Sequence, residues 1–242
     1  MAFDETEARE RIIVALDCGP VQALDIAERL AGHARWVKVG MTLYYAVGPS
    51  IVRSMHKLGY KVFVDLKLHD IPHQVHGAAQ SLGQAGADLI TVHASGGEDM
   101  MAAALTGARE GAARADDGTQ TPFVCAITVL TSMDALQLAA CGVSDSPMGQ
   151  VTRLASLAQR SGLDGIVCSP QEAAAMRALL GPAALIITPG VRPEGSAPAD
   201  QSRIATPAEA LAAGASHLVI GRPITGQPDV VSAFEGIAAS LA

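Results

Sequence analysis

The stretch YKVFVDLKLHDIP, residues 60–72, joins an apolar run to a group of charged residues. The apolar part is typical of a buried strand. Asp65 and Lys67 are two residues apart, so on a strand their side chains point to the same face, and Asp70 follows just past the expected strand end. Charges are rarely buried without partners. The stretch predicts a catalytic cluster at the C-terminal end of a barrel strand, and the alternative is a solvated rim with a weak ion pair.

Short aliphatic runs alternate with amphipathic segments along the whole chain. The expected strands are Arg11–Asp17, Trp36–Met41, Tyr60–Lys67, Asp88–Ala94, Pro122–Leu130, Gly165–Ser169, Leu185–Thr188 and His217–Gly221. The expected helices cover residues 21–32, 44–58, 73–86, 98–114, 147–161, 170–180, 206–213 and 228–241. Regular alternation of strand and helix predicts a parallel sheet, and eight units predict closure into a single (β/α)8 barrel over residues 1–242.

Composition agrees with this fold and excludes several classes of protein. Hydrophobic residues make up 49% of the 242 and aromatic residues only 3%, as expected for an aliphatic core of parallel strands. The net charge of −7 argues against a nucleic-acid surface. We also expect no membrane span, no signal peptide and a cytoplasmic protein. The four scattered cysteines suit reduced thiols rather than a disulfide framework or a metal site.

Polar residues follow several of the expected strands. If the barrel is correct, all of these strand ends open at one mouth. The polar residues concerned are Asp17, Lys38, Asp65, Lys67, Asp70, His93, Thr131, Ser132, Arg192 and Arg222, and Pro189 and Gly221 lie beside the two arginines. Their joint placement favours a functional site over unrelated solvated charges.

One side of this mouth is expected to bind phosphate. Arg192 and Arg222, with the N–H groups around Gly221, follow strands seven and eight, the usual phosphate position in such barrels. Pro223 is expected to begin a short helix there. The irregular stretch of residues 189–205 is predicted to be a phosphate-clamping loop, with a passive mobile loop as the alternative. The sequence therefore predicts a phosphorylated small molecule as ligand.

The chain resembles the orotidine 5'-phosphate decarboxylases over nearly its whole length. The resemblance rests on motifs in the family's order: VALD (14–17), KVG (38–40), DLKLHDIP (65–72), VHA (92–94), VLTS (129–132), TPGVRP (188–193) and IGRPIT (220–225). It implies that the chain removes CO2 from orotidine 5'-phosphate to give UMP, without cofactor or metal.

The resemblance also implies a role for each site residue. Lys67 is the expected proton donor, flanked by Asp65 and Asp70 as catalytic carboxylates. The expected substrate contacts are Asp17 and Lys38 at the ribose, Thr131 and Ser132 at the pyrimidine, and Gln201, Arg222, Arg192, Pro189 and Gly221 around the phosphate.

A homodimer is implied as well, because Asp70 and Ile71 are expected to reach the partner's active site. One departure concerns the two residues after Ile-Pro. The family commonly has Asn-Thr there, and this chain has His73-Gln74. In the family that threonine helps to bind a ribose hydroxyl across the dimer interface, and Gln74 stands at its position in this chain.

The residue types suit this chemistry. Loss of CO2 from C6 leaves charge that the pyrimidine ring delocalises poorly, so a cation held at C6 stabilises it and then supplies the proton. Flanking carboxylates favour the charged form of Lys67. Repulsion between Asp70 and the substrate carboxylate is a lesser contribution.

Two alternatives remain at this point. The first is a Mg²⁺-dependent sugar-phosphate aldolase or decarboxylase of the hexulose-phosphate synthase type, which also carries an Asp-x-Lys-x-x-Asp strand. Lys38 stands where such enzymes have an acidic metal ligand, and a cation beside Asp65 disfavours Mg²⁺. The second is a non-catalytic phosphate-binding barrel, because fold alone does not establish function.

Overall fold

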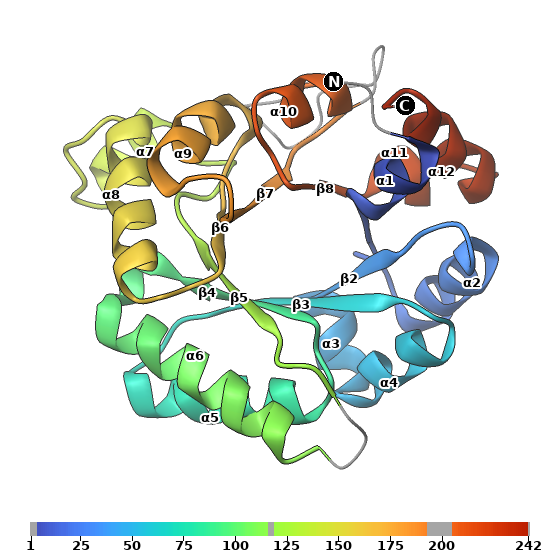
Figure 1. The fold of residues 1–242 in the computed structure, drawn as a ribbon, viewed down its shortest axis with the longest axis horizontal. Coiled ribbons are helices and arrows are strands. Elements are labelled where there is room, and N and C mark those ends of the chain that lie inside the picture. The colour runs from blue at the N-terminus through green and yellow to red at the C-terminus, as the bar shows by residue number, and fades with distance from the viewer. Residues whose placement is uncertain (1–3, 116–118, 193–204, 242) are drawn as a thin grey trace.

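The computed structural model describes residues 4–115, 119–192 and 205–241. Eight parallel strands close into a barrel in sequence order, with the last strand paired to the first (Figure 1). The strands are β1 (Ile12–Ala15), β2 (Trp36–Gly40), β3 (Lys61–Leu68), β4 (Leu89–His93), β5 (Phe123–Ile127), β6 (Gly165–Val167), β7 (Leu185–Pro189) and β8 (His217–Ile220). The eight predicted strands and the predicted barrel are therefore confirmed.

Helices surround the barrel on its outside (Figure 1). They are α1 (Glu5–Glu10), α2 (Pro20–Leu30), α3 (Met41–Val47), α4 (Ser50–Lys57), α5 (Pro72–Gln84), α6 (Glu98–Ala113), α7 (Ala135–Ala140), α8 (Pro147–Arg160), α9 (Ala173–Leu180), α10 (Pro207–Ala212), α11 (Arg222–Thr225) and α12 (Val230–Ala239). Two 3-10 turns, η1 (Ala94–Gly96) and η2 (Pro170–Glu172), complete the described elements. Among these helices, none is both long and apolar enough to cross a bilayer.

Strand residues alternate between two cores. Side chains such as Trp36, Phe63 and Leu89 fill the barrel interior, and their neighbours Val62 and Ile90 face the helices. This alternation follows from the pleat of each strand. It determines which residues near the carboxyl ends of the strands point into the mouth.

Several boundaries differ from the sequence prediction. The segment predicted as one helix over residues 44–58 is two helices, because Gly48 adopts a left-handed conformation (φ 79°) and Pro49 follows it. The short helices α1 and α7 were not predicted. β5 ends at Ile127, so Thr131 lies in the loop after this strand and not at its tip. The short helix expected at Pro223 is present as α11.

Candidate active site

A cavity of about 440 Å³ opens at the carboxyl ends of the strands. Seven strands contribute side chains to its wall or floor, including Ala15, Phe63, Ile127 and Val219. The predicted site residues that line it are Asp17, Lys38, Asp65, Lys67, Thr131, Pro189, Arg192, Gly221 and Arg222. The structure therefore brings most of the predicted site together in one cavity.

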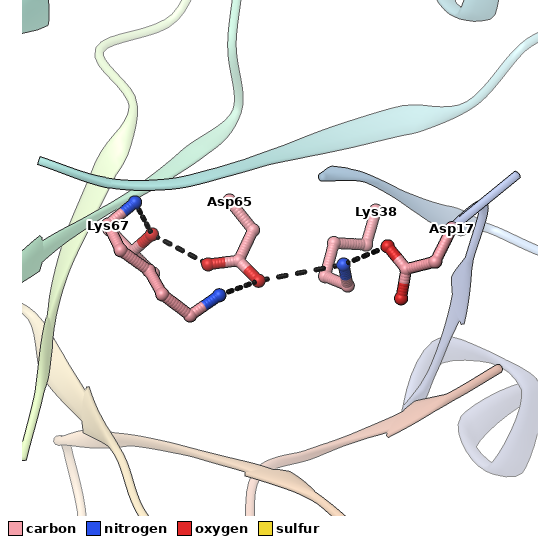
Figure 2. A network of polar contacts seen from close by, with 5 residues as sticks. Asp17, Lys38, Asp65 and Lys67 are labelled. Atoms are coloured by element: carbon pink, nitrogen blue, oxygen red, sulfur yellow. Dashed lines mark hydrogen bonds and ion pairs between the residues drawn. The ribbon is translucent and has the colours of Figure 1, made fainter. Parts of the chain in front are cut away.

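Four charged side chains form a chain of alternating sign across one wall (Figure 2). Lys67 Nζ donates to Asp65 Oδ2 at 2.8 Å, and Lys38 Nζ lies 3.6 Å from the same oxygen. Lys38 Nζ also donates to Asp17 Oδ1 at 2.7 Å. The Asp65 carboxylate therefore lies between two ammonium groups, which hold it by charge and by hydrogen bonding.

The central pair of this chain is buried and the two ends are more accessible. The side chains of Lys38 and Asp65 are 8% and 9% exposed, whereas Lys67 is 27% exposed and Asp17 is 59% exposed. Burial alone would raise the pKa of the Asp65 carboxyl. The ammonium groups of Lys38 and Lys67, with hydrogen bonds from Lys67 and Thr91, outweigh burial and hold this pKa below its ordinary value. Asp65 is thus a fixed anion that anchors both lysines.

Gly40 at the end of β2 leaves room for this arrangement. It lies opposite Asp65 in the register between β2 and β3. A Cβ atom at Gly40 would lie 2.6 Å from Asp17 Oδ1 and 3.0 Å from Lys38 Nζ. Any larger residue would therefore displace the ion pair between Lys38 and Asp17.

The backbone at Lys67 departs from a regular strand. Lys67 has φ 52°, and no other non-glycine residue of the described chain has a positive φ. The register between β3 and β4 shifts between Val64 and Leu68. Asp65 and Lys67 do meet on one side, as predicted, but across an irregular segment and not through simple strand alternation. Left-handed backbone in a non-glycine residue is strained and is concentrated at functional sites.

Two arginines lie on another part of the cavity wall, after β7 and β8. Arg222 is the first residue of α11, directly after Gly221. Arg192 donates from Nη1 to the carbonyl of Val191 at 2.9 Å, and its backbone N–H donates to the carbonyl of Ala205. The cavity thus combines a cationic part suited to a phosphate with the Asp–Lys chain on β1, β2 and β3.

Some predicted site residues lie outside this cavity. Asp70 and Ile71 are exposed, and Asp70 lines a separate hollow that it shares with Tyr45, Gln74 and Lys67. Ser132 is exposed and does not line the cavity. Gln201 and the greater part of the predicted loop, residues 193–204, lie outside the described residues.

Thr91 is a site residue that the sequence prediction missed. It is fully buried on β4, and its side chain faces the barrel interior, as that of Leu89 does. Its hydroxyl donates to Asp65 Oδ1 at 2.8 Å. A polar residue at an inward position of an otherwise apolar strand is the signal that could have identified it.

His93, at the end of β4, lies close enough to this network to feel the charges of Lys67 and Asp65. Its ring lies 5.2 Å from that of His69, centroid to centroid. Burial, followed by the nearby His69 and Lys67, lowers the pKa of His93. A neutral imidazole here adds no further positive charge beside Lys67.

Another groove, of about 850 Å³, lies on the outside of the barrel between α10 and α12. Its charged lining residue is Asp229, which caps α12 by accepting from the backbone of Val231 and Ser232. This groove is larger than the mouth but lacks convergent charged groups, so the mouth is the better candidate for catalysis. Among the described residues, no cluster of three or more histidine, cysteine or acidic side chains is arranged to hold a metal ion.

Comparison with known proteins gives a consistent result. Residues 10–237 match the family described as "Orotidine 5'-phosphate decarboxylase / HUMPS family". The chain is 49% identical over 233 residues to an orotidine 5'-phosphate decarboxylase of Anaeromyxobacter sp. (strain K), covering 96% of this chain and 98% of that protein. It is 48% identical over 236 residues to the enzyme of the same name from Moorella thermoacetica, covering 97% and 93%.

A solved structure shares the fold as well. The crystal structure of orotidine 5'-phosphate decarboxylase from Lactobacillus acidophilus superposes with a TM-score of 0.84 at 36% identity, covering 96% of this chain and 99% of that one. The similarity therefore extends over nearly the whole chain.

Proposed function

Because the chain belongs to the orotidine 5'-phosphate decarboxylase / HUMPS family, we propose that it converts orotidine 5'-phosphate to UMP and CO2, with Lys67 as the proton donor. The assignment of Lys67 rests on the series of charged side chains that runs from Asp17 through Lys38 and Asp65 to Lys67 in the mouth of the barrel. In this series, the buried carboxylate of Asp65 holds the ammonium group of Lys67 against an open cavity.

The reaction breaks the bond between C6 of the pyrimidine and its carboxylate carbon. The electron pair stays on C6, and CO2 leaves. The Lys67 ammonium stabilises this developing charge and then transfers a proton to C6, which gives UMP. The neutral amine regains its proton from water. No electron sink is needed if the ammonium is fixed beforehand at the position where the charge develops.

Neighbouring side chains hold Lys67 in a fixed position. Asp65 accepts from Lys67 at 2.8 Å and is itself held by Lys38. Preorganised charges of this kind cost no reorganisation during the reaction, which is why they stabilise a transition state more than mobile water does. We assign Asp65 as a catalytic carboxylate that orients Lys67.

The remaining cavity residues suit the other parts of the nucleotide. Arg222 and Arg192, with the backbone around Gly221, are assigned to the phosphate; Pro189 lines the cavity beside them, and Gln201 belongs to the same predicted group. Asp17 and Lys38 are assigned to the ribose hydroxyls. Thr131 is assigned to the pyrimidine, with Ser132 beside it. Binding the phosphate far from the reacting carbon supplies energy that can be used to position C6 against Lys67.

We further propose that the enzyme is a homodimer whose subunits complete each other's sites. Asp70 and Ile71 are exposed in the single chain, and Ile71 is 62% exposed. Tyr45, which is 74% exposed, lines the hollow that contains Asp70 and Lys67. Exposed apolar side chains beside the mouth suit a contact with a second copy, across which Asp70 reaches the partner's substrate.

The metal-dependent alternative is less compatible with the geometry. Lys38 Nζ lies 3.6 Å from Asp65 Oδ2 and 2.7 Å from Asp17 Oδ1. A divalent cation bound by these carboxylates would be repelled by the ammonium group between them.

The test is the absorbance change on adding orotidine 5'-phosphate to purified protein in EDTA. Wild type should form UMP, and Lys67→Ala should lose more than about a thousandfold in kcat while still binding UMP. Lys61→Ala is the matched control, because Lys61 lies at the other end of β3, 5.3 Å from the centre of the Trp36 ring. Activity only with Mg²⁺ on a sugar phosphate would favour the aldolase alternative, and near-normal turnover by Lys67→Ala would refute the role of Lys67.

A further inference from the structure

The pairing of β3 with β4 is uneven at the residues that carry the chemistry. Val64 pairs with Ile90, and Leu68 pairs with Val92. Three residues of β3, 65–67, therefore lie opposite a single residue of β4, which is Thr91. A bulge of this kind removes the regular partners of the backbone and redirects side chains. Thr91 is thus the residue of β4 that faces the bulge.

The Thr91 hydroxyl replaces the missing backbone partner. The backbone N–H of Lys67 donates to Thr91 Oγ1 at 3.1 Å. The same hydroxyl donates to Asp65 Oδ1 at 2.8 Å, while Asp65 Oδ2 accepts from Lys67 Nζ. A hydroxyl can accept and donate at once, so one side chain holds the backbone of Lys67 and the carboxylate that orients its ammonium group.

We propose that Thr91 is a positioning residue for the decarboxylation: its hydroxyl fixes the left-handed backbone of Lys67 and the carboxylate of Asp65 in one arrangement. This inference rests on the proposed function of Lys67. The φ of 52° at Lys67 is disfavoured for a residue with a side chain, so surrounding contacts must maintain it. Thr91 supplies such a contact to the backbone nitrogen of Lys67 itself.

The position allows little substitution. Thr91 is 0% exposed and points into the barrel. Replacing its hydroxyl by a methyl group would leave the Lys67 N–H and Asp65 Oδ1 without this partner in a buried environment. Asp65 would then keep only its contacts to the two lysines through Oδ2, so its carboxylate could turn about them, and the ammonium group of Lys67 would be held less firmly against the substrate.

The test compares three variants in turnover and binding. Thr91→Val is expected to lower kcat for orotidine 5'-phosphate by about tenfold to a hundredfold, with KM and the dissociation constant of UMP within a few-fold of wild type. Thr91→Ser keeps the hydroxyl and is expected to restore most of the lost kcat. Thr188→Val is the matched control: Thr188 is also 0% exposed, on β7, and its hydroxyl has no hydrogen-bond partner among the described residues. It should keep wild-type kcat.

The outcomes are distinguishable. Wild-type kcat in folded Thr91→Val would overturn the positioning role, and so would a Thr91→Ser variant as slow as Thr91→Val. If Thr91→Val does not fold, Thr91→Ala removes the same hydroxyl with less bulk, and the serine variant is still decisive. If wild type itself shows no decarboxylation and binds no UMP, the proposed function fails, whatever the result at Thr91.

Discussion

The ammonium group of Lys38 lies 3.6 Å from the carboxylate of Asp65, and both side chains are more than nine-tenths buried. Lys38 is also bonded to the more accessible Asp17 at 2.7 Å. A buried ion pair is a weak source of stability by itself, but removing one partner leaves an uncompensated charge. Lys38 therefore links the stability of the barrel mouth to its chemistry.

Lys38→Met tests this link. The variant keeps the apolar stem and removes the charge, so Asp65 retains only Lys67 as a cationic partner. We expect the free energy of unfolding to fall by about 3 kcal/mol and kcat to fall as well, because Asp65 would then orient Lys67 less firmly. Urea unfolding and steady-state kinetics measure the two effects.

Lys57→Met is the matched control for this substitution. Lys57 is an exposed lysine, the last residue of α4, and does not line the cavity. It should change neither quantity appreciably. Unchanged stability and unchanged kcat in Lys38→Met would contradict the linking role of Lys38.

Much of the mouth could be predicted because its chemistry is local in sequence. Parallel strands buried on both faces give short aliphatic runs, and polar residues just after those runs must gather at one end of a barrel. Asp17, Lys38, Asp65 and Lys67 were found in this way, and the cavity contains all four.

The bulge opposite Thr91 could not be predicted, because it depends on how β3 pairs with β4. Nothing in residues 60–72 specifies that three residues should face one residue about 25 positions later. The break at Gly48 and Pro49 was a different failure. Both residues are helix breakers, but the apolar spacing on either side continued across them and favoured a single helix. The trans role of Asp70 remains a prediction.

Arg222→Ala tests the phosphate side of the cavity. Arg222 is at the start of α11 and lines the cavity. Loss of a charge-assisted contact to phosphate should weaken UMP binding by about tenfold to a hundredfold. Uridine, which lacks the phosphate, should bind both proteins equally. Calorimetry with UMP and uridine therefore separates a phosphate contact from a general loss of structure.

Arg160→Ala is the matched control for the phosphate experiment. Arg160 is an exposed arginine that pairs with Glu98 at 2.7 Å on the helix layer. It should leave the affinity for UMP unchanged. An equal loss of UMP and uridine binding in Arg222→Ala, or no loss of either, would count against the phosphate assignment.

Mixing two inactive variants tests whether Asp70 acts across a dimer. Lys67→Ala lacks the proton donor, and Asp70→Ala lacks the carboxylate proposed to reach the partner. In a mixed dimer, the site with an intact Lys67 would receive an intact Asp70 from the other subunit. Refolding an equal mixture should therefore restore about a quarter of wild-type activity, since half of the dimers are mixed and each has one complete site. Activity no higher than that of the separate variants would show that Asp70 serves its own subunit or none.

A histidine at the end of the barrel opposite the mouth is expected to make the protein less stable in acid. His217, at the start of β8, packs its ring against that of Trp36, with centroids 5.7 Å apart. Its Nδ1 atom is buried without a hydrogen-bond partner among the described residues. Burial, with the nearby cations Arg11 and Lys61, lowers the pKa of His217 from 6.5 to about 4.

The lowered pKa of His217 determines how the stability of the protein changes with pH. Below about pH 6.5 the unfolded chain binds a proton at His217, and the folded protein does so only near pH 4. Acid therefore favours the unfolded state between these values, and His217 should cost up to about 3 kcal/mol of stability by pH 4. Above pH 6.5, His217 is neutral in both states and does not lower the free energy of unfolding. His217→Gln cannot titrate, so urea unfolding at pH 7 and pH 4.5 should show a smaller loss for this variant than for wild type. An equal loss in the two proteins would mean that other groups, such as the carboxylates of the mouth, account for the acid sensitivity.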